Sequence, residues 1–178
     1  MIFVFLYYII KVGKKTLNIL TCGDKPGGKK EAFISNKFSE ELIMKIIYGP
    51  KGTGKTQKAI DSANAAAKTA KGHVLFVADT DKNMYDLDRA VRFIDAGRFD
   101  IRGQEGFRGF LKGLVAANAD NDLVYIDSIK RITKTELSEL KELFAAMEWL
   151  EKEYGVEFVL TCSGELKELP EFIAKYAE

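Results

Sequence analysis

The chain has 178 residues, 30% of them charged and 47% hydrophobic, which is enough for one domain with a substantial core. With 27 basic and 26 acidic residues the formal net charge is +1, so charge does not support binding to nucleic acid. Cys22 and Cys162 belong to no Cys-x-x-Cys pair or Cys/His cluster, which argues against a disulfide scaffold or a structural zinc site.

The charge is unevenly distributed along the chain. Residues 1–43 contain seven lysines and four acidic residues, a net charge of +3, whereas residues 44–178 carry a net charge of −2. The chain opens with ten apolar residues, about half the length that a membrane-spanning helix needs. No basic region precedes this run and no small-residue cleavage site follows it, unlike in a secretory signal. We therefore expect a cytoplasmic protein without a membrane span.

We expect the chain to divide at Met44 into an N-terminal extension, residues 1–43, and a globular domain, residues 44–178. Residues 23–29 match part of a phosphate-loop pattern, but Lys30 stands where that pattern needs Ser or Thr, so a turn is favoured. The extension is expected to be poorly ordered, or to be a translated leader ahead of a true start at Met44. The change in composition and the strand that follows Met44 motivate this expectation.

Four short apolar runs predict the strands of a parallel sheet. Each run is continuous rather than alternating, as in strands that are covered on both faces. They occupy residues 45–48, 74–78, 123–126 and 156–160, and a brief extended stretch at residues 99–102 is a candidate edge strand. His73, the single histidine, precedes the second run and is interpreted as a polar strand-end residue without a catalytic role.

Three helices are predicted between these runs. The first spans residues 54–71 and is rich in Ala and Lys, and Gly72 is expected to end it in a left-handed conformation. The second spans residues 84–96, where Leu87, Val91 and Ile94 recur at helical spacing. The third spans residues 107–119.

A fourth helix is predicted between the last two strands. Thr133 and Glu136 form a capping-box pattern, apolar residues follow at steps of three or four, and Gly155 ends the pattern. Trp149 lies in this helix and is expected in the core. Strands and helices thus alternate throughout residues 44–178. This order predicts an α/β three-layer sandwich with a mostly parallel sheet, whose ligands bind beyond the carboxyl ends of the strands.

The strongest motif is GPKGTGKT at residues 49–56, a full match to the phosphate-loop pattern G-x-x-x-x-G-K-[ST]. It leaves a strand and opens a helix, so backbone N–H groups can surround phosphate oxygens at the positive end of the helix. Lys55 is expected to reach the β- and γ-phosphates, and Thr56 to ligate Mg²⁺. The expected nucleotide-binding residues are Gly49, Pro50, Lys51, Gly52, Thr53, Gly54, Lys55, Thr56 and Gln57.

Polar residues at the ends of the other strands are candidates for the rest of the site. Asp127 follows an apolar strand, as a second anchor for the metal does, or else it begins the next turn. Asp81, or alternatively Asp79, is the candidate for orienting or deprotonating water, although either could simply cap a helix. Thr161 and Ser163 could sense the γ-phosphate or belong to a turn.

The runs GPKGTGKT, VLFVADTD and LVYIDSI, in this order, resemble the ATPase core of RecA-like P-loop proteins, including KaiC- and DnaB-type members. The resemblance covers residues 44–163. It implies that Asp81 takes the place of the water-activating Glu, Asp127 that of the metal-linked Asp, and residues 161–163 the γ-phosphate-sensing region. Asp81 is one methylene shorter than that Glu, which bears on the efficiency of hydrolysis.

Two features of the sequence differ from related P-loop families. The segment after Ser128 has little room for the long DNA-binding loops of recombinases. The loop also resembles the AAA+ sequence GPPGTGKT, but Lys51 replaces its proline and Ser128 replaces the acidic residue expected after Asp127.

The sequence therefore predicts a minimal RecA-like domain that binds ATP and Mg²⁺ and hydrolyses ATP. Two alternatives stay open: a P-loop kinase that phosphorylates a small acceptor, and a nucleotide-dependent switch that does not hydrolyse and acts through a partner. A homo-oligomer or another protein partner is compatible with the family resemblance. No particular arginine stands out as a finger.

Overall fold

The computed structural model describes residues 8–12, 15–19, 44–164 and 166–177, in two compact units, Met1–Glu41 and Leu42–Glu178. The described part of the first unit is an antiparallel pair of strands, β1 (Tyr8–Val12) and β2 (Lys15–Ile19), which the sequence analysis did not anticipate. The phosphate-loop-like residues 23–29 lie outside the described residues, and so does most of the predicted extension.

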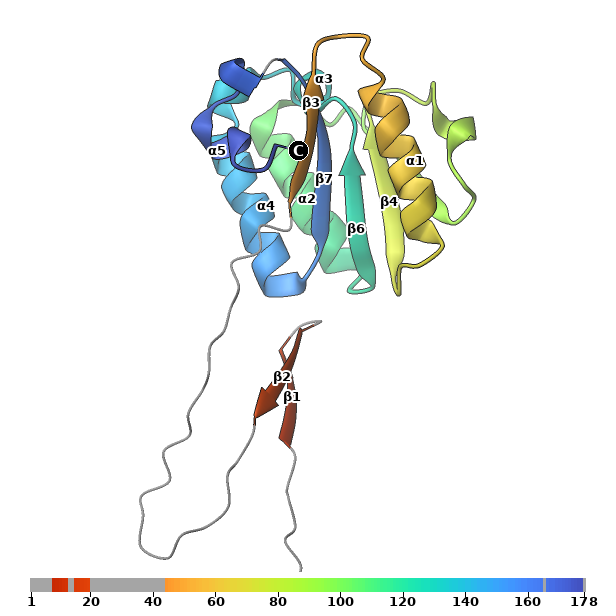
Figure 1. Ribbon diagram of the computed structural model, residues 1–178, viewed down its shortest axis with the longest axis vertical. Helices are drawn as coiled ribbons and strands as arrows, with labels where there is room; N and C mark the ends of the chain where they lie inside the picture. Colours follow the sequence, from red (N-terminus) through yellow and green to blue (C-terminus); the bar gives the residue numbers. More distant parts are fainter. Residues whose placement is uncertain (1–7, 13–14, 20–43, 165, 178) are drawn as a thin grey trace, which may run out of the picture. The chain divides into compact units, whose positions relative to one another are not determined.

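The second unit is built on a parallel sheet of five strands in the order β3-β7-β6-β4-β5 (Figure 1). The order places β7 between β3, which leads into the phosphate loop, and β6, which leads to Asp127. The strands are β3 (Lys45–Gly49), β4 (His73–Ala78), β5 (Val91–Asp95), β6 (Asn121–Ile126) and β7 (Glu157–Ser163).

Helices cover both faces of this sheet, which confirms the predicted α/β three-layer architecture. Helix α1 (Lys55–Ala67) packs on one face with Phe76 and Tyr125, whereas α2 (Gly103–Ala117) and α4 (Lys141–Tyr154) pack on the other with Leu75 and Val77. Alternate residues of β4 thus enter different cores, as expected of a strand buried on both sides. The longest helix, α2, has 15 residues, and no helix in the described ranges has the length and apolar character to cross a bilayer.

The shorter helices in the connections are α3 (Ile129–Thr133) and the 3₁₀-helices η1 (Met84–Asp86) and η2 (Leu137–Glu139). The 3₁₀-helix η3 (Leu166–Glu168) and α5 (Glu171–Ala174) follow the last strand, β7.

The predicted helix over residues 84–96 is wrong. Only η1 is helical there, and the chain then forms the edge strand β5. Val91 and Ile94 are buried because they pair with Val74 and Val77 of β4, not because they share one side of a helix. A spacing that fits a helix was therefore outweighed by pairing between strands. The candidate edge strand at residues 99–102 is wrong for the same reason, since β5 takes the edge.

The two glycines that were predicted to end helices have different roles in the structure. Helix α1 ends at Ala67, and Gly72 does not have a positive φ; a Cβ there would come 2.1 Å from the carbonyl oxygen of Asp120. Gly72 is thus required by close backbone packing and not by a left-handed cap. Gly155, by contrast, does end α4 in the left-handed conformation, with φ of 69°.

The predicted capping box and the predicted burial of Trp149 are wrong. Thr133 is the last residue of α3, and its hydroxyl donates to the carbonyl oxygen of Ile129 at 2.9 Å. Glu136 instead pairs with Lys130, and α4 starts only at Lys141. Trp149 lies on the outer side of α4 with 45% of its surface exposed.

The segment after β7 returns to the sheet, which the sequence analysis missed. Leu169, Ile173 and Tyr176 are buried in the core on the α4 side. The backbone N–H of Ile46 donates to the carbonyl oxygen of Tyr176 at 2.9 Å, and Ile46 forms a parallel bridge with Ala177. This segment therefore lies along the outer edge of β3.

Candidate functional site

The loop between β3 and α1 depends on three glycines with positive φ. Gly49, Gly52 and Gly54 have φ of 147°, 88° and 77°, which residues with a Cβ rarely adopt. The Thr53 hydroxyl closes the loop by donating to the carbonyl oxygen of Pro50 at 2.9 Å. The spacing of the glycines in the motif is therefore explained by the backbone conformation of the loop.

The loop delivers the chain into an open helix N-terminus. The first helical backbone bond in α1 runs from the N–H of Lys58 to the carbonyl oxygen of Gly54, at 3.0 Å. No acidic residue occupies the first turn, and no side chain caps it among the described residues. The leading N–H groups of a helix have no partner within the helix and carry its positive partial charge. This end of α1 is therefore suited to an anion such as phosphate.

Lys55 places its ammonium group inside the loop. The Nζ atom donates to the carbonyl oxygens of Gly49 at 2.8 Å and Pro50 at 2.7 Å, and the residue is only 9% exposed. Gln57, two residues further along α1, is exposed and donates from Nε2 to Asp61 Oδ1 at 3.0 Å. Of these two expected contacts to a nucleotide, Lys55 is thus held in the loop and Gln57 is paired along the outside of α1.

The structure brings Thr56 and Asp127 together, although 71 residues separate them. The Thr56 hydroxyl donates to Asp127 Oδ1 at 2.9 Å. Asp127 is 4% exposed, and its backbone N–H donates to the carbonyl oxygen of Val77 on β4 at 2.8 Å. The two residues expected to hold a metal are thus in direct contact, and the carboxylate is fixed by its strand.

Thr161 also contacts Asp127. It lies on β7, the strand between β3 and β6. Its hydroxyl donates to Asp127 Oδ1 at 2.8 Å and accepts from the backbone N–H of Ser128 at 2.7 Å. The side chain is buried, so these bonds are shielded from water. Thr161 therefore supports Asp127, a role that differs from the phosphate contact suggested by its position at the end of a strand.

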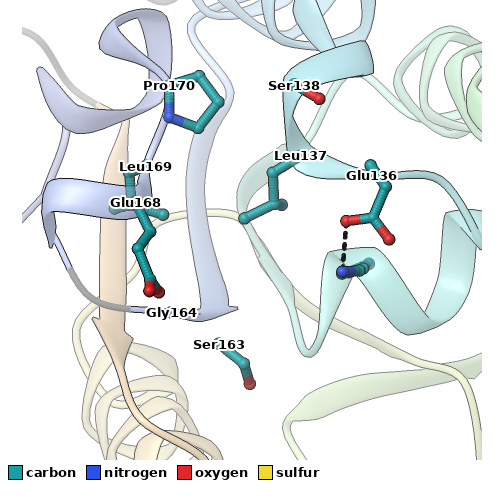
Figure 2. Close-up of a pocket in the computed structure, with 9 residues that line it drawn as sticks. Glu136, Leu137, Ser138, Ser163, Gly164, Glu168, Leu169 and Pro170 are labelled. Carbon is teal, nitrogen blue, oxygen red and sulfur yellow. Dashed lines mark hydrogen bonds and ion pairs between the residues drawn. The ribbon is translucent and has the colours of Figure 1, made fainter.

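Ser163, the last residue of β7, is exposed. It pairs with Gly49 across β3 and β7, and the next residue, Gly164, donates from its N–H to the Gly49 carbonyl oxygen at 3.1 Å. Ser163 and Gly164 border a hollow of about 250 Å³, whose lining also includes the ion-paired Lys130 and Glu136. Ser163, Gly164 and Glu136 are labelled in Figure 2. This hollow adjoins the start of the phosphate loop.

The two candidate base residues after β4 have different surroundings. Asp81 is exposed in a turn, where its carbonyl oxygen accepts the Met84 N–H at 3.0 Å. The Asp79 side chain is only 14% exposed and forms an ion pair with Arg131, with 2.8 Å between Asp79 Oδ2 and Arg131 Nη2. A Cβ on Gly97 would come 2.4 Å from the Asp79 carbonyl oxygen, so the backbone there is closely packed. The Asp79 side chain is thus held in place by Arg131, whereas Asp81 is exposed to solvent.

Arg131 is the residue of this region that the sequence analysis missed. It lies on α3, the short helix that follows Asp127 and Ser128, and its guanidinium group reaches the end of the neighbouring strand β4. No motif in the sequence marks it. Only the adjacency of β4 and β6 explains how α3 reaches Asp79.

Cys162 and His73 do not take part in the site. Cys162 is buried, and burial raises the pKa of its thiol to about 12, against a smaller lowering by the Lys55 charge. It is therefore a neutral, packed thiol. His73 is exposed at the start of β4, at the opposite end of that strand from Asp79.

No protein-family model and no curated protein matches the chain. Among solved structures, the fold is similar to the flagellar accessory protein FlaH from Methanocaldococcus jannaschii, with 20% identity and a TM-score of 0.45 over 74% of this chain and 65% of FlaH. It is also similar to domain III of the replication initiation protein DnaA from Thermotoga maritima, with 18% identity and a TM-score of 0.41 over 75% of this chain and 50% of that one. The chain thus spans less than two thirds of either protein.

The arrangement of the site itself defines the class of fold. A parallel sheet, a glycine-rich loop that joins a strand to a helix, a lysine within the loop and an aspartate at the end of another strand are the parts of a P-loop domain.

Proposed function

We propose that the domain binds ATP together with Mg²⁺ in the phosphate loop. The observation that carries this proposal is the 2.9 Å hydrogen bond from the Thr56 hydroxyl to Asp127 Oδ1, beneath an open helix N-terminus. In P-loop proteins these two residue types hold the metal that bridges the phosphates. Together with Lys55 they provide the anion site and the metal site that a nucleotide needs.

The residues fit magnesium in particular. Mg²⁺ prefers oxygen ligands and is usually held by one or two protein oxygens, with waters and substrate phosphates completing its coordination. The described residues contain no group of three or more His, Cys, Asp or Glu side chains that could hold a metal by themselves. Thr56 and Asp127 would hold the ion, which when bound would neutralise charge on the phosphates.

Lys55 and the loop would bind the phosphates directly. The carbonyl oxygens of Gly49 and Pro50 already hold the Lys55 ammonium group inside the loop, so its position is set before any ligand arrives. Such preorganisation lowers the entropic cost of binding. The N–H groups at the start of α1 would add hydrogen bonds to the same phosphate oxygens.

We propose ATP hydrolysis as the reaction, with Asp81 as the candidate base and Asp79 as its alternative. The exposed position of Asp81 also supports a second candidate function, a nucleotide-dependent switch with slow or no turnover. A base must come within hydrogen-bond reach of the attacking water, and Asp81 lies in a turn beyond the end of β4.

We further propose that the domain is RecA-like. Its support is that Asp127 and Asp79 follow adjacent strands, β6 and β4, in agreement with the sequence resemblance. A second copy of the chain or another protein would be the partner for which the nucleotide state matters.

Calorimetric titration with ATP and Mg²⁺ tests the proposed binding. Lys55→Ala should weaken affinity by about 10- to 100-fold, because it removes charge-assisted hydrogen bonds to phosphate. Lys58→Ala is the matched control, an exposed lysine one turn along the same helix, and should change affinity by less than about twofold. Absence of ATP binding by the wild-type protein would refute the proposal.

Turnover measurements separate the reactions. Phosphate release by the wild-type protein that is lost in Asp81→Asn supports hydrolysis with Asp81 as base. Loss in Asp79→Asn alone assigns the base to Asp79. Binding without release indicates the switch, and turnover only with an added small acceptor indicates a kinase.

A further inference from the structure

A second hollow lies at the carboxyl edge of the sheet, on the side of β4 and β5. Its volume is about 270 Å³, and it lies between the loop that follows β5 and the helix α3. Its lining residues are Asp79, Gly97, Ile101, Arg102, Arg131, Ile132 and Lys134. It shares none of these with the phosphate loop.

The lining is strongly cationic. Arg102, Arg131 and Lys134 contribute three positive charges, and Asp79 is the one carboxylate. Asp79 is already engaged by Arg131 at 2.8 Å, so the lining keeps a net charge of +2. Arg102 comes from the loop after β5, whereas Arg131 and Lys134 come from α3 and its C-cap, so cations from two segments line one hollow.

Two of these cations are available to a ligand. The Lys134 side chain is exposed and has no hydrogen-bond or ion-pair partner among the described residues. Arg102 Nε contacts Asp100 Oδ1 at 2.6 Å, but both side chains are about three-quarters exposed. Water screens an exposed pair of this kind, so a multiply charged anion can compete for Arg102.

Backbone strain is concentrated in the same two segments. In the described ranges three residues other than glycine have positive φ: Asp100 at 51°, Ser128 at 58° and Lys134 at 54°. Ser128 and Lys134 flank α3 as its N-cap and C-cap, and Asp100 holds Arg102. Residues other than glycine rarely adopt a left-handed conformation, and strain of this kind gathers at ligand-binding sites.

We propose that this hollow is a second anion-binding site, which takes a phosphate or carboxylate group through Arg102, Arg131 and Lys134. Because α3 follows Asp127 and Ser128 directly, an anion in the hollow would bind beside the proposed metal site. The anion has two potential sources: the terminal phosphate of the nucleotide itself, or a second small molecule with a phosphate or carboxylate group.

Pyrophosphate titrations in a Lys55→Ala background isolate the hollow, because that substitution disables the phosphate loop. In this background Arg102→Gln/Lys134→Gln should weaken pyrophosphate binding at least about tenfold, since it removes two charged donors and leaves the Asp79–Arg131 pair in place. Lys68→Gln/Lys152→Gln is the matched control, which removes two exposed lysines at the ends of α1 and α4 and should leave the affinity unchanged.

Asp79→Asn tests the same hollow, because it should change the affinity for pyrophosphate in the opposite direction. Removing the only carboxylate of the lining releases Arg131, so pyrophosphate should bind roughly fivefold more tightly. Weaker binding in this variant would overturn the proposal. So would an absence of pyrophosphate binding in the Lys55→Ala background, or an equal affinity in the double variant and its control.

Saturation with a non-hydrolysable ATP analogue and Mg²⁺ then identifies the source of the anion in the wild-type protein. If the nucleotide supplies it, the analogue should exclude pyrophosphate from the hollow, and Arg102→Gln/Lys134→Gln should weaken analogue binding. If a second molecule supplies it, pyrophosphate should still bind beside the analogue. The Lys55→Ala background tests the hollow apart from the phosphate loop, so failure of one site is distinguishable from failure of the other.

Discussion

The carboxyl edge of the sheet has an inner half, at the ends of β3, β7 and β6, and an outer half, at the ends of β4 and β5. In the inner half Lys55, Asp127 and Thr161 are buried and joined to the backbone or to one another by hydrogen bonds. In the outer half Tyr85 and Phe99 are 89% and 70% exposed.

The difference shows that adjacency to a strand does not make a residue part of a site. Asp127 directly follows β6, and its N–H still bonds to β4, so the sheet fixes its carboxylate. Asp81 stands beyond the end of β4, in a turn where the sheet no longer determines its side-chain direction. The inner half is thus preorganised for binding, whereas the outer half is open to ligands and partners.

Asp127→Asn should have the largest effect of the tests of this contrast. Asparagine keeps an oxygen that accepts from Thr56 and Thr161 but removes the charge. We expect the affinity for ATP in Mg²⁺ to fall about 10- to 100-fold and the affinity in the presence of a chelator to change little. Titrations with and without Mg²⁺ measure both values, and an equal loss in each would show that Asp127 does not act through the metal.

Thr161→Val should show that the inner half also stabilises the fold. The substitution removes the hydrogen bond to Asp127 and leaves the Ser128 N–H without its acceptor, so the free energy of unfolding should fall by about 1–3 kcal/mol. Thr161→Ser keeps the hydroxyl and serves as the control. Urea denaturation measures both variants, and a loss in Thr161→Val no larger than that in Thr161→Ser would show that the hydroxyl group does not stabilise the fold through these bonds.

Alkaline pH should weaken the inner half through Cys162. The folded-state pKa of its thiol is raised to about 12 from an ordinary value of 9.0, so the folded state keeps the proton longer than the unfolded state does. This contribution to stability is complete below pH 9 and is lost as the pH rises toward 12, by about 1 kcal/mol at pH 10. Cys162→Ala should therefore show a shallower loss between pH 8 and 10 than the wild-type protein. Parallel slopes would mean that the thiol does not contribute.

Asp81→Asn should have the smallest effect on stability. Its side chain is exposed in a turn, so the free energy of unfolding should stay within about 0.5 kcal/mol of the wild-type value. Thermal unfolding checks this. A loss above 1 kcal/mol would place Asp81 among the fixed residues and remove the contrast between the two halves.

The local sequence was sufficient to predict much of the inner half, because the motifs there are short and constrain the backbone directly. The glycines of the loop and the apolar run before Asp127 each constrain a few consecutive residues. Thr161 was found as a polar strand end, but its partner was not, because contact with Asp127 depends on β7 lying between β3 and β6.

The outer half was predicted poorly because pairing between distant segments decides its structure. Val91 and Ile94 suit one side of a helix and also an edge strand, and only the neighbouring strand β4 resolves this ambiguity. Arg131 reaches Asp79 across two adjacent strand ends, a contact that no spacing in the sequence contains. Outside this half, Trp149 resembled a core residue by its type, but it lies on the exposed side of α4.

The bridge between Ile46 and the backbone at residues 176–177 bears on solubility. An uncovered edge strand is a template on which another chain can add, and β3 would be such an edge without this cover. A chain shortened before α5 would therefore be prone to assemble edge to edge through the strand that leads into the phosphate loop. Residues 176–177 thus protect against aggregation, because they keep the edge of β3 paired within its own chain.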